Sequence, residues 1–273
     1  DVPLTHIDGI DDRRVRDFRV VSDPELMRRR RLFVAEGHMA VERLLLSRFQ
    51  VRSLLVTESA YQRLRGTLDR LNRDVEVFLT TATGLREVTG FRFHRGCLAL
   101  GERSVATTFS HLVSESCRPI VALEALSDPD NVGSIFRTSA AFGVTGLLLS
   151  PTCADPLYRK AIRTSMGATL QVPFSIDAEW PNELKIIRKG GTLLVGLTPD
   201  PTAVDFETFI AESKGIPMAL LFGSEGVGLS REVLELCDMH VRIAVEESTD
   251  SLNVAISAAI VLQRYAVTTR GVS

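Results

Sequence analysis

Five short apolar segments in the second half of the chain constrain its fold more than any other feature. Each is four or five residues long, contains almost no polar side chain and is followed by a stretch with helical character. They lie at Ile120–Leu123, Gly146–Leu149, Leu193–Leu197, Met218–Phe222 and Val241–Val245. Strands that are apolar on both sides are typical of a parallel sheet with helices on both faces. The sequence therefore predicts an α/β domain of this kind over residues 118–273.

The front of the chain predicts a smaller α/β domain over residues 1–102, because helix-like and strand-like segments alternate there. Helices are expected at 24–31, 38–47 and 60–71, and strands at 32–35, 51–56, 75–80 and 97–100. Residues 103–117 are rich in Ser and Thr and show no strong period, which indicates a linker.

Composition limits the classes of function. Hydrophobic residues make up 45% of the chain and charged residues 24%, as in soluble globular proteins. No apolar run reaches the ~20 residues of a membrane helix. The four cysteines (Cys97, Cys117, Cys153 and Cys237) lie far apart, and the five histidines have no metal-like spacing. We therefore expect a protein of the reducing cytoplasm, without a metal site.

Charge is distributed unevenly along the chain. Residues 1–105 contain 19 Arg or Lys and 15 Asp or Glu, a net charge of +4, whereas the remaining 13 and 19 give −6. This asymmetry fits an RNA-binding module joined to a catalytic module, or two solvated surfaces that differ by chance. The run Arg28-Arg29-Arg30-Arg31 is open to two interpretations as well: RNA contacts, or a solvated helix end that stabilises the helix dipole.

A first motif follows the strand at Ile120–Leu123. It reads Asp128-Pro129-Asp130-Asn131-Val132-Gly133-Ser134-Ile135-Phe136-Arg137-Thr138-Ser139-Ala140-Ala141-Phe142-Gly143. Its Asp-, Pro- and Asn-rich start predicts a turn from the strand into a helix, with Asn131 as a candidate cap. Arg137 comes almost two turns into that helix, where the backbone holds it firmly.

A second motif, Gly223-Ser224-Glu225-Gly226-Val227-Gly228-Leu229-Ser230, follows the strand at Met218–Phe222. Its three glycines permit positive φ angles and close approach of the backbone to a ligand, and Ser230 can cap the next helix. It has neither the lysine of a phosphate-binding Walker loop nor the glycine spacing of the dinucleotide fingerprint. A tight turn without a ligand remains the alternative.

A third motif, Ser251-Leu252-Asn253-Val254-Ala255, opens a helix whose side chains are small and apolar on nearly every side. Such a helix is buried or lies in an interface. Asn253 either caps this helix or serves a site.

Together the three motifs resemble those of the SpoU/TrmH family of RNA ribose 2′-O-methyltransferases, of the SPOUT class. The segments 33–37 and 94–99 resemble the N-terminal substrate-binding domain of many members, and 162–168 resembles a further family block. The chain departs from the family pattern at Ile243-Ala244-Val245, where Ile-Pro-Met is common, and in the acidic segment 246–250 that follows.

The resemblance implies a SPOUT domain with a trefoil knot, a homodimer, S-adenosylmethionine as cofactor and methyl transfer to a ribose hydroxyl of structured RNA. Ribosomal RNA is favoured as the substrate, and transfer RNA is one alternative. A protein that binds RNA or S-adenosylmethionine without turnover is the other alternative, which the presence of Arg137 disfavours. The implied catalytic residues are Arg137, Asn131, Glu225 and Asn253. The implied cofactor residues are Thr198, Phe222, Gly223, Ser224, Glu225, Gly226, Ile243, Leu252 and Asn253. The expected RNA contacts are Arg28, Arg29, Arg30, Arg31, Arg95, Arg163 and Ser165.

An arginine side chain is effectively always protonated at neutral pH. We therefore expect Arg137 to orient the substrate and clamp phosphate rather than to remove a proton, and the general base stays open.

Overall fold

The computed structural model describes residues 4–7, 9, 11–71, 75–90, 96–103, 109, 118–246 and 251–270. The chain divides into two compact units. Unit 1 comprises Asp1–Val105 and Pro156–Gln171, and unit 2 comprises Ala106–Asp155 and Val172–Ser273.

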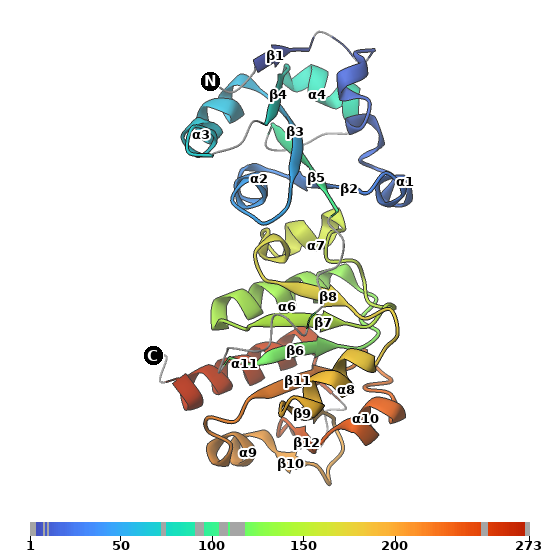
Figure 1. The fold of residues 1–273 in the computed structure, drawn as a ribbon, viewed down its shortest axis with the longest axis vertical. Coiled ribbons are helices and arrows are strands. Elements are labelled where there is room, and N and C mark those ends of the chain that lie inside the picture. Colours follow the sequence, from blue (N-terminus) through green and yellow to red (C-terminus); the bar gives the residue numbers. More distant parts are fainter. Residues whose placement is uncertain are drawn as a thin grey trace. The chain divides into compact units, whose positions relative to one another are not determined.

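Unit 1 contains a five-stranded sheet (Figure 1). In sheet order the strands are β1 (Leu4–His6), β4 (Glu76–Leu79), β3 (Val51–Val56), β5 (Cys97–Glu102) and β2 (Leu32–Glu36). Strands β1, β4 and β3 run parallel, whereas β5 is antiparallel to both β3 and β2. The helices are η1 (Arg13–Val15), η2 (Phe18–Val20), α1 (Pro24–Arg29), α2 (His38–Leu45), α3 (Glu58–Leu68), α4 (Ala82–Thr89), α7 (Arg159–Thr164) and η3 (Ala168–Leu170). The alternation predicted from the sequence is confirmed.

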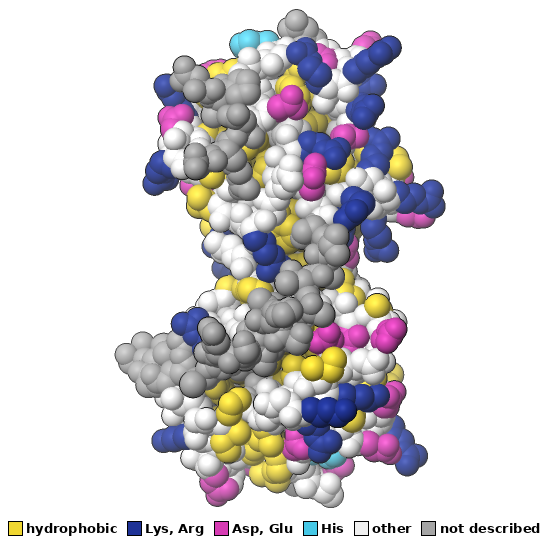
Figure 2. Space-filling model, viewed as in Figure 1, with side chains coloured by type: hydrophobic (Ala, Val, Ile, Leu, Met, Phe, Trp, Pro, Cys, Tyr) yellow, Lys and Arg dark blue, Asp and Glu magenta, His cyan; other side chains and the backbone are white. Residues whose placement is uncertain are grey.

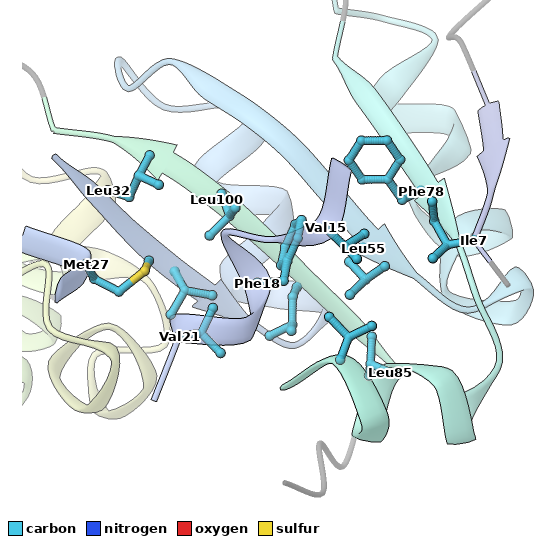
Figure 3. Packing of buried hydrophobic residues seen from close by; sticks show 13 residues of the cluster. Ile7, Val15, Phe18, Val21, Met27, Leu32, Leu55, Phe78, Leu85 and Leu100 are labelled. Carbon is cyan, nitrogen blue, oxygen red and sulfur yellow. The ribbon is translucent and has the colours of Figure 1, made fainter. Parts of the chain in front are cut away.

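One face of this sheet is covered by η1, η2 and α4, and Figure 3 shows how their side chains meet. Phe18 is fully buried and lies near Leu55 and Leu100 of the sheet. The cluster is completed by Ile7, Val15, Val21, Met27, Leu32, Val34, Phe78, Leu85, Val88 and Leu98. Removing this apolar surface from water is what holds the short helices of residues 13–20 on the sheet.

Helix α7 and η3 belong to unit 1, although in sequence they lie between strands of unit 2. Ala161 and Ile162 of α7 are buried, and the helix packs on β2. The Arg43 guanidinium of α2 donates a hydrogen bond to the carbonyl of Met166, with Nη1 and O 2.6 Å apart. From the sequence, residues 156–171 were expected to lie in the C-terminal domain, which was expected to begin at residue 118. Sequence order does not reveal that the apolar face of α7 packs on β2, a strand of unit 1.

Unit 2 contains the predicted parallel sheet. Its strand order is β10 (Val204–Asp205), β12 (Met239–Arg242), β9 (Leu193–Leu197), β11 (Met218–Phe222), β6 (Ile120–Leu123), β7 (Gly146–Leu149) and β8 (Phe174–Ile176). All neighbouring strands run parallel. The strand expected at 241–245 was misplaced: β12 begins at Met239, and it ends where its neighbour β9 runs out, since Val241 pairs with Leu197, the last residue of β9.

Helices cover both faces of this sheet, as Figure 1 shows. They are α6 (Pro129–Phe142), α8 (Asn182–Lys189), α9 (Phe206–Glu212), α10 (Arg231–Leu236) and α11 (Val254–Arg270). Leu194, Ala219 and Leu221 point to the face where α8 and α10 pack. Helices α6 and α11 pack against each other, and α9 packs against α11.

The strand order reverses next to β6. Strands β7 and β8 follow on one side of β6, whereas β11 and β9 lie on its other side. In open α/β sheets, ligands bind outside the carboxyl ends of the strands at such a reversal. The knot implied by the resemblance stays a prediction. Among the described residues, no helix is both long and apolar enough to cross a membrane.

Candidate functional site

Three polar side chains from distant parts of unit 2 meet at the carboxyl edge of its sheet. Asn131 comes after β6, Glu225 after β11 and Asn253 after β12. The Nδ2 group of Asn131 donates to Oε1 of Glu225 at 3.2 Å, and Nδ2 of Asn253 donates to the same oxygen at 2.6 Å. Nδ2 of Asn253 also donates to Oδ1 of Asn131 at 3.0 Å. The three sequence motifs therefore form one hydrogen-bonded cluster.

Asn131 is available for this cluster because another residue caps its helix. Asp128 has extended backbone angles, and its Oδ1 accepts from the amide of Asp130 at 2.9 Å, while Pro129 occupies the first helical turn. The expectation that Asn131 caps α6 was therefore wrong: an Asp-Pro start places the cap three residues earlier. Asn131 lies inside the first turn and directs its amide to Glu225.

The loop that carries Glu225 is held in shape by its glycines. A Cβ atom on Gly223 would lie 2.1 Å from the carbonyl carbon of Gly228, so only glycine fits there. The amide of Gly228 donates to the carbonyl of Ser224 at 2.9 Å, and Gly226 and Gly228 have φ angles of +88° and +75°. Ser230 caps α10, as predicted, through its hydroxyl and the amide of Val233.

Asn253 both caps a helix and completes the cluster. Its Oδ1 accepts from the amides of Ala255 and Ile256 at 2.9 and 3.2 Å at the start of α11. Its Nδ2 group is then directed at Glu225 and Asn131. The capping interpretation of this residue is confirmed. Its role in a site stays a prediction, which its contacts with the other two motifs support.

The remaining expected cofactor residues lie at the same edge. Thr198, Phe222 and Ile243 follow or end β9, β11 and β12, which are consecutive strands with β9 in the middle. The amide of Thr198 donates to the carbonyl of Val241 at 3.0 Å. Phe222 is buried, so only its backbone can reach a ligand, whereas Thr198, Gly223, Ser224, Ile243 and Leu252 are partly exposed, and Glu225, Gly226 and Asn253 are exposed.

Glu124 is a residue that the sequence analysis missed. It directly follows β6, is 8% exposed and accepts three hydrogen bonds from neutral donors. Oε1 accepts from Trp180 Nε1 at 2.9 Å and from the hydroxyl of Ser230 at 2.8 Å, and Oε2 accepts from the amide of Ser230 at 2.7 Å. Its own amide donates to the carbonyl of Phe222. Glu124 thus ties both ends of the Glu225 loop to β6; a polar residue at the end of an apolar strand was the available signal.

Arg137 lies on α6 but outside the cluster. It comes six positions after Asn131, so its side chain is turned about 120° around the helix axis from that of Asn131. It is exposed, and it makes no hydrogen bond or ion pair with any residue that the structure describes. Its guanidinium is therefore available to an anionic ligand.

The expected RNA residues all belong to unit 1, and their surroundings differ. Arg28, Arg29, Arg30, Arg31 and Arg163 are exposed, whereas Arg95 lies outside the described residues. Ser165 is fully buried, donates to the carbonyl of Ile162 and accepts from the amide of Thr169. We assign Ser165 to the turn after α7, because its hydroxyl is already used within the protein.

The two described cysteines of unit 2, Cys153 and Cys237, are poor candidates for nucleophiles. Burial raises the pKa of Cys237 to about 12 and also raises the pKa of Cys153, so both stay protonated and weakly reactive near neutral pH. Within the described parts of the chain, no three His, Cys, Asp or Glu side chains gather as metal ligands would.

Comparison with known proteins identifies the family of the chain. The SpoU rRNA methylase family matches residues 118–263, which contain all three motifs. The chain belongs to this family. A relative from Mycobacterium bovis, an uncharacterized tRNA/rRNA methyltransferase, is 36% identical over 267 residues, covering 93% of this chain and 92% of the relative.

Solved structures of similar proteins share the fold. An AdoMet-bound rRNA methyltransferase from Sinorhizobium meliloti superposes with a TM-score of 0.80 at 24% identity, covering 97% of both chains. An RNA 2′-O ribose methyltransferase superposes with a TM-score of 0.75 at 24% identity, covering 98% of this chain and 100% of the other. The SpoU family fold therefore extends over both units, and the expected combination of an N-terminal α/β domain with a SPOUT domain is confirmed.

Proposed function

We propose that the protein transfers a methyl group from S-adenosylmethionine to a ribose 2′-hydroxyl of structured RNA, in the cytoplasm, and that the RNA is ribosomal. The observation that carries the proposal is the Asn131–Glu225–Asn253 cluster at the carboxyl edge of the sheet in a SpoU-family chain. In the reaction the S–CH3 bond breaks, an O–CH3 bond forms and the hydroxyl proton leaves, which yields S-adenosylhomocysteine and a 2′-O-methylribose.

The residues at this edge suit the cofactor, whose sulfonium supplies an activated methyl group. Thr198, the loop from Phe222 to Gly226, Ile243 and Leu252 present mostly backbone groups from neighbouring strands. Because these contacts are to backbone, the Ala244-Val245 departure from the family pattern is compatible with binding.

Glu225 and Arg137 are given separate roles. Oε1 of Glu225 is held by two amide donors, whereas Oε2 makes no hydrogen bond to the described residues and can accept one from the ribose hydroxyl or the cofactor. Arg137 orients the substrate and clamps a phosphate through its planar fork of donors. Holding the hydroxyl in line with the sulfonium then supplies much of the rate.

We also propose that the protein acts as a homodimer through α11. Ile256, Ile260 and Val267 are exposed by 53%, 37% and 39% and recur every four to seven residues along one side of this helix. A row of exposed apolar side chains is typical of an interface. A second copy would cover this row and complete the site beside Arg137.

Labelled S-adenosylmethionine tests the function. The protein is incubated separately with unmodified ribosomal and transfer RNA, and the RNA is digested to nucleosides and analysed by mass spectrometry. We expect label in 2′-O-methylnucleosides of ribosomal RNA. Label in transfer RNA alone would show that transfer RNA, not ribosomal RNA, is the substrate. Label on a base would refute the ribose assignment. Binding without any transfer would favour the binding-only alternative.

A further inference from the structure

We propose that five arginines at one end of the unit 1 sheet form a binding face for the phosphate backbone of RNA. These residues, here called the arginine face, are Arg16, Arg30, Arg31, Arg52 and Arg103. The inference rests on the proposed function in one respect, since it takes RNA as the substrate.

Asp17 gathers three of these arginines from separate elements. Its carboxylate lies 2.6 Å from Nη1 of Arg30 at the end of α1, and 3.2 Å from Nη1 of Arg52 in β3. Nε of Arg16, which precedes Asp17 in the chain, lies 3.9 Å away. Asp17 is only 14% exposed, whereas the three arginine side chains are 75% (Arg16), 37% (Arg30) and 42% (Arg52) exposed. The carboxylate therefore lies beneath the guanidinium groups and orders them.

The strand register places Arg31 and Arg103 at the same end of the sheet. Glu102 of β5 pairs with Leu32 of β2, and its Oε1 lies 3.0 Å from Nε of Arg52. The amide of Arg103 donates to the carbonyl of Arg31 at 2.8 Å, Nη2 of Arg31 donates to the carbonyl of Arg103 at 3.5 Å, and Nε of Arg103 donates to the carbonyl of Leu32 at 3.0 Å. Arg31 and Arg103 therefore lie beside each other at the end of the sheet where Arg52 contacts Glu102, although the three arginines are far apart in the sequence.

The arginine face has an excess of positive charge. Five guanidinium groups against the carboxylates of Asp17 and Glu102 leave a net charge of +3. Figure 2 shows Lys and Arg side chains gathering on the side of unit 1 that carries α1. Guanidinium forks bind phosphate oxygens in pairs, so ordered arginines on one surface suit a polyphosphate chain.

This face differs from the Arg28–Arg31 run considered from the sequence. Arg29 pairs with Glu25 four residues earlier, and the Arg28 side chain makes no hydrogen bond or ion pair to a described residue. Only Arg30 and Arg31 belong to the arginine face, which takes its other members from residues 16, 52 and 103.

The test compares two pairs of substitutions with equal change in charge. Arg30→Gln with Arg52→Gln removes two arginines of the face, and Arg65→Gln with Arg70→Gln removes two at the end of α3. The full-length variants are titrated with a labelled RNA hairpin that has a single-stranded loop, over a salt series. Losing two phosphate contacts should flatten the slope of log affinity against log salt by about 1.4. Over the tenfold range from 1 M to 0.1 M salt, this slope change corresponds to about 25-fold weaker binding at 0.1 M.

The Arg65/Arg70 pair should change hairpin affinity by less than about threefold, because neither residue contacts Asp17 or Glu102, and salt screens exposed charges that make no direct phosphate contact. Equal losses for the two pairs, or no loss for the first, would overturn the arginine face. Thermal melting is measured alongside, because Asp17 loses two partners in the first pair. If that pair does not fold, Arg16→Gln with Arg31→Gln decides the question by the same slope, since both side chains are exposed and the Arg30 and Arg52 pairs with Asp17 remain.

Two further readouts separate the possible failures. Methyl transfer by the wild-type protein tests the proposed function, whereas the hairpin titration tests only the face, so one can fail without the other. Polyglutamate serves as the probe for an acidic protein partner. Binding of polyglutamate that is tighter than hairpin binding, and is lost in the Arg30/Arg52 pair, would overturn the assignment to RNA.

Discussion

Single side chains in this site serve the fold and the cluster at once. Asn253 uses its oxygen to cap α11 and its amide nitrogen to hold Glu225 and Asn131. Asp128 takes the capping role at α6, which leaves the Asn131 amide for Glu225. The residue types at these positions therefore follow from the donors and acceptors that the helix caps and the Asn131–Glu225–Asn253 cluster require.

Replacing Asn253 by Asp separates its two roles. Asp keeps an oxygen that can cap the helix, so the free energy of unfolding should change by less than about 1 kcal/mol, within the range of cap substitutions. It loses the amide donors and places a carboxylate beside Glu225, so we expect methyl transfer to fall by about 100-fold or more. Circular dichroism melting and a transfer assay check this. Normal transfer by the variant would show that the Asn253–Glu225 contact is dispensable.

Arg137→Ala should remove an exposed cation whose guanidinium makes no hydrogen bond or ion pair with a described residue. We expect methyl transfer to fall by about 100-fold to 1,000-fold, as for the loss of one transition-state donor, with cofactor affinity changed by less than about twofold. Calorimetry with S-adenosylhomocysteine and single-turnover transfer measure the two effects. A loss of cofactor binding would mean that the roles of α6 and the strand-end loops are not separate.

At the scale of elements, the Glu225 loop is clamped to the end of β6. Glu124 receives three hydrogen bonds there, two of them from Ser230 at the start of α10. The loop leaves β11 at Phe222, whose carbonyl accepts from the amide of Glu124. One buried carboxylate therefore connects the strand before motif one with the loop of motif two.

Glu124→Ala leaves three partly buried donors without their acceptor, which should lower the free energy of unfolding by about 1 kcal/mol for each lost hydrogen bond, or about 3 kcal/mol in all. Cofactor affinity should fall as well, because the loop loses its anchor. Glu124→Gln is the matched control: its amide oxygen can still accept from Trp180 and the Ser230 hydroxyl, so about half of the stability should return. Urea unfolding and calorimetry measure these effects. Wild-type stability of the Ala variant would contradict the clamp.

At the scale of the whole molecule, chain order and packing do not coincide. Residues 156–171 lie between β7 and β8 in sequence, yet they are part of unit 1 and bury Ala161 and Ile162 there. A protein that lacks residues 1–116 would expose these two side chains to solvent. The full-length chain is therefore the proper material for experiments on assembly.

Ile256→Asp with Ile260→Asp tests the homodimer. Two carboxylates in the exposed apolar row of α11 would be desolvated in an interface, so the full-length variant should be a monomer at micromolar concentration while the wild type is a dimer. Val204→Asp is the control, because Val204 is 40% exposed on the edge strand β10. Light scattering gives the masses; a monomeric wild type, or a dimeric variant, would contradict the α11 interface.

Sequence alone determined the parallel sheet, the alternating N-terminal domain and the three motifs, because side-chain periodicity and turn residues are local properties. It did not reveal that Asn131, Glu225 and Asn253 share hydrogen bonds across 94, 122 and 28 residues. Nor did it reveal that Ser165 is buried or that Glu124 is the anchor of a loop. Those contacts depend on strand order: β11 inserts between β9 and β6 and brings distant loop ends to one edge, a non-local arrangement that only the packed chain decides.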